Sequence, residues 1–254
     1  MNPHHFIDMG AKQDYWVSRW DSMQEFYNPD RKKRFAALVS LIKAKCPEPK
    51  RILDLGCGTG SIMEECLNAF PAVHIIGVDL DFTLLALAQS RLKKFAPRFT
   101  TVEADFREEN WSSGLPTDFD AVVSATALHW LSESQLALLY SHIHRLLKVT
   151  GIFLNADHVG SSDASLQKAW IEQKKRLRPP LPQTGEPWES FWNDYLNELG
   201  STANAKRSEA IGAWNGVEDG LPLDWHFEKL KQAGFRKVDC YYRFYADAIY
   251  GAVK

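Results

Sequence analysis

The sequence has 254 residues, of which 45% are hydrophobic and 24% charged, which is enough to bury the core of one large α/β domain with an embellishment. The formal net charge of −2 argues against the basic surface of most nucleic-acid-binding proteins, and the basic runs at 31–34 and 174–178 fit solvated helix faces better. No stretch approaches the roughly 20 apolar residues that span a membrane, and no leader sequence is evident. We therefore expect a cytoplasmic protein with no nucleic-acid or membrane partner.

The four cysteines show no pattern of a disulfide framework or a structural metal site. Cys46, Cys57, Cys66 and Cys240 form no CxxC pair and have no histidine at zinc-finger spacing. We expect a reducing compartment and no bound metal.

The first 50 residues differ from the rest of the chain. An aromatic-rich segment at 1–30 precedes a predicted helix at 31–45, whose apolar residues lie on one side. From residue 51 the sequence alternates regularly between strand and helix signals. The predicted strands are 51–55, 73–79, 99–104, 119–124 and 152–157, and the predicted helices are 60–69, 82–95 and 132–148. This alternation predicts an α/β fold with a doubly wound, mostly parallel sheet.

The alternation stops near residue 159. The segment 159–222 lacks strand patterns and is best fitted by helices, so it reads as an inserted, mainly helical cap. Its aromatic residues are Trp170, Trp188, Phe191, Trp192, Tyr195 and Trp214. A helix at 224–233 and two final strands then return to the core, which we predict to comprise 51–158 and 223–254.

The segment 51–63, RILDLGCGTGSIM, predicts a buried strand, a tight turn and a helix. Such a turn can bind a dinucleotide, a phosphate or S-adenosylmethionine (SAM). The dinucleotide pattern needs its third glycine three residues after the second, where this chain has Ser61, while Gly60 comes one residue early. Asp54 suits a ligand ammonium and would repel a pyrophosphate. The turn therefore fits the methionine end of SAM better than a dinucleotide.

Two further acids follow the next two strands. Asp79 can accept both hydroxyls of a ribose, and Asp105 can accept the exocyclic amine of adenine while Phe106 lies on the ring. Because the carboxyl ends of parallel strands meet at one edge of the sheet, we expect all three acids to face one crevice.

These motifs together resemble the class I SAM-dependent methyltransferases, over about residues 35–157 and 224–254. ILDLGCGTG matches the first motif of that family, GVDLD its ribose-binding acid, EADF its adenine segment and DAVVSATALHWL the segment after its fourth strand. The resemblance implies a Rossmann-like fold with seven strands, the last antiparallel and inserted between the fifth and sixth. It also implies a set of cofactor-binding residues, namely Asp54, Gly56, Gly58, Gly60, Asp79, Leu80, Asp105, Phe106 and Ser124.

The segment ALHWL resembles that of the trans-aconitate and malonyl-carrier-protein O-methyltransferases. By this resemblance His129 lies over the methyl end of the cofactor. His129 and His158 are the candidate catalytic residues, since a neutral histidine can take a proton from a hydroxyl or amine acceptor. The candidate substrate contacts are Tyr15, Trp16 and Trp20 in an N-terminal flap, Trp130 beside His129, and Arg176 and Trp192 in the cap.

We therefore expect a SAM-dependent methyltransferase that acts on a small molecule by in-line methyl transfer, as a monomer or homodimer. Two alternatives remain open at this stage. One is a SAM-binding enzyme of other chemistry, such as carboxyl transfer onto SAM itself. The other is a non-catalytic SAM-binding module that engages a partner protein, although such a module has no need for the glycines and the three acids.

Overall fold

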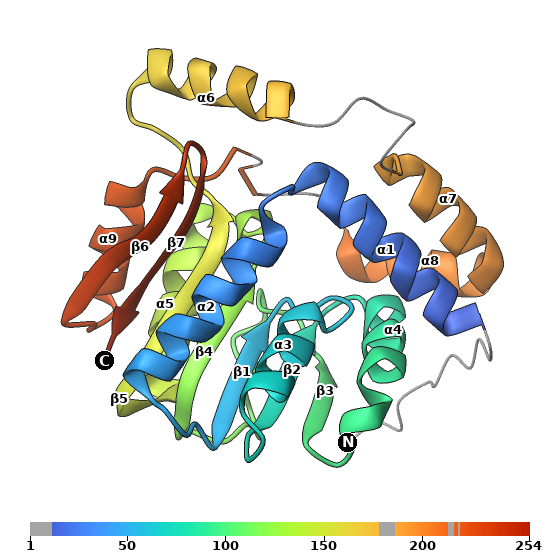
Figure 1. Cartoon of the computed structure of the whole chain (residues 1–254), viewed down its shortest axis with the longest axis horizontal. Helices are drawn as coiled ribbons and strands as arrows, with labels where there is room; N and C mark the ends of the chain where they lie inside the picture. Colours follow the sequence, from blue (N-terminus) through green and yellow to red (C-terminus); the bar gives the residue numbers. More distant parts are fainter. Residues whose placement is uncertain (1–11, 178–185, 213–215, 218) are drawn as a thin grey trace.

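The computed structural model describes residues 12–177, 186–212, 216–217 and 219–254, built around a seven-stranded sheet (Figure 1). The strands are β1 (Arg51–Leu55), β2 (His74–Asp79), β3 (Phe99–Glu103), β4 (Phe119–Ala125), β5 (Leu147–His158), β6 (Lys237–Phe244) and β7 (Asp247–Val253). Their order is β3-β2-β1-β4-β5-β7-β6, with β7 antiparallel to both of its neighbours and the pairs among β1 to β5 parallel. The predicted doubly wound sheet with an inserted antiparallel last strand is confirmed.

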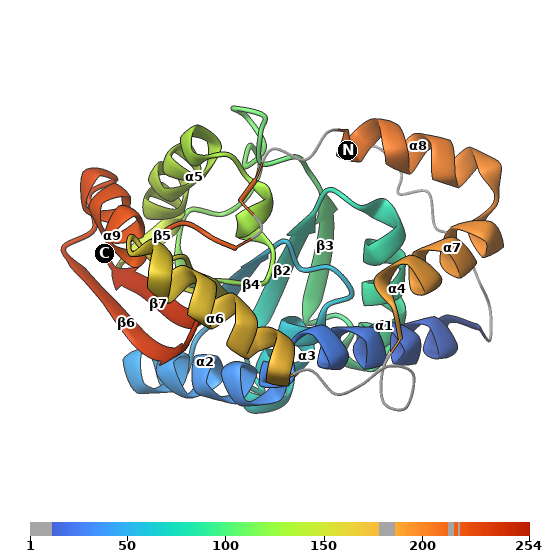
Figure 2. The ribbon, with the colours of Figure 1, turned by 90° about the horizontal axis from the view of Figure 1, so that it is seen from above.

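Helices cover both faces of this sheet (Figure 2). One face carries α2 (Arg31–Lys45), α3 (Ser61–Ala69) and α4 (Phe82–Leu92), and the other carries α5 (Glu133–Leu146) and α9 (Leu223–Gln232). The strands at the centre are buried on both sides, which explains why their sequences are continuous apolar runs rather than alternating ones. A serine followed three residues later by a glutamine is the sequence pattern of a capping box, and Ser132 and Gln135 exchange these hydrogen bonds at the start of α5.

The boundaries of two elements differ from the expectation by more than two residues. The helix predicted at 82–95 ends as α-helix at Leu92 and continues as a 3₁₀ turn, Lys93–Phe95. Strand β5 starts at Leu147, five residues early, because Leu147 pairs with Phe119 before an irregularity shifts the register. Such an irregularity depends on the neighbouring strand, so the local sequence does not show it.

The N-terminal aromatic segment forms a helix, α1 (Gln13–Tyr27). Its buried apolar residues, Trp16, Trp20, Met23 and Phe26, recur every three or four positions and so lie on one side. Three of them join residues of α4 and of α7 (Trp188–Leu199) in a separate hydrophobic cluster. The N-terminal segment therefore packs on the inserted helices as well as on the core.

Three helices, α6 (Ala164–Leu177), α7 and α8 (Ser201–Ile211), lie between β5 and α9 in the described part of the chain. Helix α7 packs on α1 and α8, whereas α6 buries none of its residues and lies apart from the sheet (Figure 1). Trp214, one of the aromatic residues of the predicted cap, lies outside the described residues. Within the described ranges, none of the helices has the length and apolarity that crossing a membrane requires.

Candidate functional site

A pocket of about 810 Å³ opens at the carboxyl ends of the parallel strands. It is lined by the glycine turn after β1, by the segments that follow β2, β3, β4 and β5, and by residues of α1, α2 and the inserted helices. Open α/β sheets bind ligands at this edge, so the topology and the cavity indicate the same place.

The glycine turn has positive φ angles, which residues with a side chain rarely adopt. Gly56, Gly58 and Gly60 have φ values of +67°, +52° and +76°. A Cβ on Gly56 would also lie 2.4 Å from the Cβ of Ala127, in the segment after β4. Gly56 and Gly58 line the pocket, while Gly60 caps the start of α3 behind them. Glycine is therefore required at the turn by both conformation and space.

Two carboxylates support this turn. Asp79 lines the pocket and accepts hydrogen bonds from the backbone N–H of Gly58 at 2.7 Å and of Asp81 at 2.9 Å. Burial raises the pKa of Asp79 to about 6, although these two bonds oppose the shift. Asp54 lies behind the pocket wall and is 1% exposed, and its Oδ2 has no hydrogen-bond partner among the described residues. Burial, reinforced by Asp79, raises the pKa of Asp54 to about 8.

The segment after β3 places Asp105 and Phe106 on the pocket wall. Arg107 pairs with Asp105 through its Nε, 2.9 Å from each carboxylate oxygen. The same guanidinium donates to the carbonyl oxygens of Ala210 and Ile211 at the end of α8. Arg107 therefore joins the predicted adenine segment to the inserted helices.

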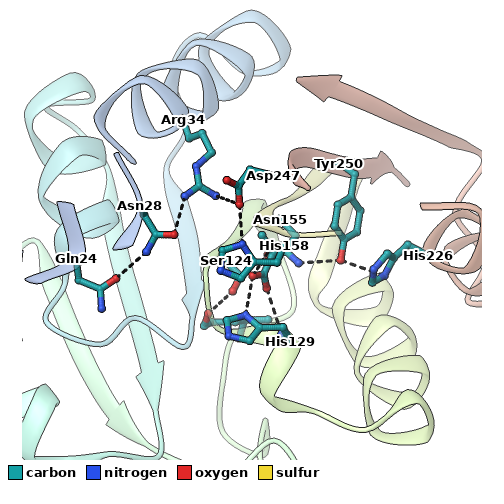
Figure 3. A network of polar contacts seen from close by, with 12 residues as sticks. Gln24, Asn28, Arg34, Ser124, His129, Asn155, His158, His226, Asp247 and Tyr250 are labelled. Carbon is teal, nitrogen blue, oxygen red and sulfur yellow. Dashed lines mark hydrogen bonds and ion pairs between the residues drawn. The ribbon is translucent and has the colours of Figure 1, made fainter. Parts of the chain in front are cut away.

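His129 and Asp157 form a hydrogen-bonded pair at the other end of the pocket (Figure 3). The Nδ1 of His129 lies 2.7 Å from Oδ1 of Asp157, and the backbone N–H of His129 donates to Oδ2 at 3.2 Å. Burial opposes ionisation of Asp157, but the neighbouring His129 outweighs it and holds the pKa of this carboxyl well below its usual range. The pair therefore resembles the carboxylate–histidine arrangement that orients a proton acceptor.

His158 belongs to a second pair of the same kind. Its Nδ1 lies 2.6 Å from Oδ1 of Asp247, and Arg34 approaches that oxygen at 3.7 Å (Figure 3). The ammonium of Lys174, on α6, lies 3.1 and 3.3 Å from the two ring nitrogens of His158. Burial lowers the pKa of His158, although its bond to Asp247 opposes the shift. The rings of His129 and His158 lie 5.1 Å apart, centre to centre.

A buried polar network lies beneath these two histidines. His226 shares its Nδ1 with the hydroxyls of Tyr140 and Tyr250, and Tyr250 also accepts a bond from Asn155 (Figure 3). Burial lowers the pKa of His226 to about 4, so this histidine is neutral at pH 7. Ser124 is completely buried and donates to the carbonyl of Leu55, away from the pocket wall.

The predicted substrate residues divide into two groups. Trp20, Trp130 and Trp192 line the pocket, as does Leu80 from the predicted cofactor set. Three others lie off its wall: Tyr15 is 54% exposed, Trp16 is buried against Phe191 and Tyr195, and Arg176 is exposed on α6.

Sequence reasoning did not identify several residues that shape the pocket. Arg207 of α8 donates to Asp81 at 2.6 Å and lies 3.7 Å above the ring of Trp192. Arg34, Lys174 and Asp247 complete the surroundings of His158. Arg207 and Asp247 stand in no motif. Arg34 and Lys174 belong to the basic runs 31–34 and 174–178, and the expectation that these runs form solvated helix faces is wrong for both residues. Arg34 is 2% exposed and the side chain of Lys174 is 23% exposed, because the folded chain places them beside Asp247 and His158.

Comparison with known proteins supports the interpretation of the turn. The model of a methyltransferase domain matches residues 52–151. The chain is 34% identical over 208 residues to a Bacillus subtilis protein named "Putative methyltransferase YqeM", covering 77% of each chain. The chain belongs to the class I SAM-dependent methyltransferases. The cofactor of this methyltransferase is therefore SAM, and the predicted family is confirmed.

The other relatives either are covered over less of their own length or are less identical to this chain. A malonyl-[acyl-carrier protein] O-methyltransferase of Legionella pneumophila is 30% identical over 48% of this chain and 41% of its own. A carboxy-S-adenosyl-L-methionine synthase of Nautilia profundicola is 22% identical over 94% of this chain and 92% of its own. The solved structure of human N-acetylserotonin methyltransferase superposes with a TM-score of 0.55 at 18% identity, over 95% of this chain and 57% of its own, which confirms the fold.

Proposed function

We propose that this methyltransferase transfers the methyl group of SAM in line to a small-molecule acceptor bound in the 810 Å³ pocket. The observation that carries the proposal is that one cavity joins the glycine turn, Asp79 and Asp105 at one end to His129 and His158 at the other. The sulfonium of SAM supplies an activated methyl group, so the chain mainly has to align the acceptor and exclude water.

The residues at the cofactor end fit a cationic amino-acid moiety joined to a nucleoside. The buried Asp54 carboxyl, with one oxygen unpartnered among the described residues, suits an ammonium reached directly or through water. Asp79 suits the ribose hydroxyls, and Asp105 with Phe106 suits adenine. Gly56, Gly58, Gly60 and Leu80 would form the backbone cradle, and Ser124 would hold β4 against β1 beneath it.

At the acceptor end, we propose His129 and His158 as the catalytic residues. An acceptor that must lose a proton would give it to Nε2 of His129, whose Nδ1 is directed at Asp157. A carboxylate acceptor needs no such base. Trp20, Trp130 and Trp192 would contact the apolar part of the acceptor, while Tyr15, Trp16 and Arg176 would act from behind or beside the wall.

We further propose that segment 159–222 is a substrate-binding cap on a core made of 51–158 and 223–254, preceded by an N-terminal flap at 1–50. Helices α7 and α8 support this division, because their contacts with α1 and α4 enclose the cofactor end of the pocket. The free cysteines Cys46, Cys57, Cys66 and Cys240 fit a reducing compartment, so we propose a cytoplasmic location, as a monomer or homodimer.

Calorimetry with SAM and with its demethylated product tests the proposal. We expect both to bind the purified chain and Asp79→Ala to bind them more weakly, whereas Asp118→Ala, at the opposite end of the sheet, should bind normally. Absence of binding, or equal binding by the two variants, would contradict the proposed site. Binding without turnover over a broad set of acceptors, with a co-purifying protein, would instead indicate a non-catalytic SAM-binding module.

A second candidate is carboxyl transfer onto SAM. The nearly full-length match to a carboxy-S-adenosyl-L-methionine synthase favours it. Mass analysis of the cofactor that co-purifies with the chain separates the candidates, because carboxy-SAM exceeds SAM in mass by one carboxylate group.

A further inference from the structure

Three residues at the acceptor end of the pocket have the composition of a metal site. His129, Asp157 and His158 each offer one ligand atom, and these atoms lie within 4.8 Å of one another. The two histidines reach the pocket wall from the segment after β4 and from the end of β5, and Asp157 lies behind them, 1% exposed. Two imidazoles and one carboxylate, with one side open, are typical of catalytic sites for divalent transition metals.

The groups around His158 are also those that typically surround a metal-ligating histidine. Ligating histidines in metalloproteins usually direct their second nitrogen to a carboxylate, which fixes the ring and makes the ligand nitrogen more basic. Here Asp247 lies 2.6 Å from Nδ1 of His158, and Arg34 approaches the same carboxylate oxygen. His158 is thus oriented with Nε2 as its ligand atom.

A small cavity of about 10 Å³ adjoins the same three residues. This is room for roughly one water-sized atom. His226 and Leu221 also line the cavity, and His226 is 3% exposed. The cavity wall therefore carries polar atoms beside the three candidate ligands, as a site for an ion or its bound water requires.

A cation of the chain itself lies beside His158. The ammonium of Lys174 is 3.1 Å from Nδ1 and 3.3 Å from Nε2 of this ring, and 4.0 Å from Asp247. Lys174 stands on α6, the helix that buries none of its residues, so withdrawing it disturbs no core packing. Repulsion between this ammonium and an external cation bound to His158 would therefore oppose metal binding.

We propose that His129, Asp157 and His158 bind a divalent transition-metal ion, with Asp247 orienting His158 and Lys174 leaving when the ion enters. The ion takes the place of the proton between His129 and Asp157, and that proton goes to solvent. Ligand atoms of a tetrahedral zinc site lie about 3.4 Å apart. His129 Nδ1 and Asp157 Oδ1 would therefore separate from 2.7 Å, while wider spacings in the cluster, which reach at most 4.8 Å, would close. A hydroxyl acceptor that reached the ion from the pocket would lose its proton more readily.

The role in methyl transfer rests on the proposed function, but the binding of the ion does not. Titration of the full chain with Co²⁺ and visible absorption spectroscopy measure binding directly. We expect the absorption bands of four- or five-coordinate Co²⁺, which Zn²⁺ abolishes. Asp157→Asn and His158→Gln should lower the Co²⁺ affinity about 100-fold, and Asp247→Asn about 10-fold. His74→Gln, at the amino end of β2, is the matched control and should change nothing.

Lys174→Met gives a test in the opposite direction, which a folding defect cannot imitate. Removing the competing ammonium should raise the Co²⁺ affinity about 10-fold. A featureless Co²⁺ titration, or equal affinities in wild type, Asp157→Asn and His74→Gln, would overturn the site, and an unchanged affinity in Lys174→Met would overturn the competition. A chain that binds SAM but no Co²⁺ refutes only the metal site, whereas one that binds Co²⁺ but no SAM refutes only the proposed function.

Discussion

The imidazole of His129 and the carboxylate of Asp157 meet at 2.7 Å across the ends of two neighbouring strands, at the end of the pocket away from the glycine turn. One residue follows β4 and the other lies in β5, so their separation depends on the register of these strands. This pair orients the ring of His129, which we propose as the catalytic base.

We expect His129→Ala to lower kcat by about 100-fold or more with an acceptor that must lose a proton, because general-base catalysis typically contributes that much. The dissociation constant of SAM should change by no more than about 2-fold, since His129 lies away from the glycine turn. Steady-state kinetics and calorimetry measure the two quantities. A large loss of SAM affinity would place His129 in the cofactor site instead.

Asp79→Ala should weaken SAM binding about 10- to 100-fold, because hydrogen bonds to charged groups contribute about 1.5–3 kcal/mol. Calorimetry provides the measurement. Asp118→Ala is the control, since Asp118 pairs with Arg51 at the amino end of β1. Similar dissociation constants for the two variants would argue against the ribose assignment.

Stability should depend on pH through Asp54. Its pKa is about 8 in the folded chain and near 4 in an unfolded one. Between these values the folded state holds more protons, so the free energy of unfolding falls as pH rises, by at most about 1.4 kcal/mol per pH unit. Urea denaturation from pH 5 to pH 8.5 should show a steeper fall in wild type than in Asp54→Asn, in which Asp79, whose pKa is about 6, still contributes. Parallel curves would mean that Asp54 is ionised throughout.

SAM binding should release protons near pH 7. A cation beside Asp54 favours its ionised form and lowers its pKa, so a carboxyl that is mostly protonated in the free chain loses its proton. The apparent binding enthalpy should therefore differ between phosphate and Tris buffers, and the difference should disappear in Asp54→Asn. Equal enthalpies in both buffers would contradict the linkage.

Gly56→Ala should destabilise the chain by about 2 kcal/mol or more and abolish SAM binding. The new Cβ meets that of Ala127 at 2.4 Å, and the φ of +67° is itself unfavourable for alanine. Thermal unfolding measures the stability. Adding Ala127→Gly relieves the steric part but not the conformational part, so it should restore stability only partly. Full restoration would show that the clash alone requires glycine.

Arg207→Met should loosen the inserted helices. It removes the bond to Asp81 and the contact above Trp192, and we expect faster proteolysis near α8 and a loss of about 1–2 kcal/mol in stability. Arg176→Met, an exposed arginine of α6, serves as the comparison. If both variants are cleaved at the wild-type rate, Arg207 does not hold α8 in place.

The amino-acid sequence predicted the alternation of strands and helices and a cofactor site at the carboxyl ends of the strands. These predictions follow from local patterns: buried β-branched runs, a glycine turn, a capping box at Ser132, and acids at strand ends that parallel topology must bring to one edge. The place of the last strand came from the family resemblance, and the order of the sheet confirms it. The local sequence predicts α1 less well. Its apolar residues recur regularly, but the residues of α7 on which they pack stand more than 150 positions away in the sequence.

The surroundings of His158, at the proposed acceptor end of the pocket, depend on the tertiary structure. His158 meets Asp247 across 89 positions of sequence, and Lys174 reaches both from an inserted helix that no motif describes. Such pairs depend on strand register and on how α6 to α8 lie over the core. Both are set by packing between residues that are far apart in the sequence, so they leave no periodic pattern of apolar residues. The methyl donor can therefore be predicted from motifs of consecutive residues. The residue pairs at the proposed acceptor end form only when the chain is folded.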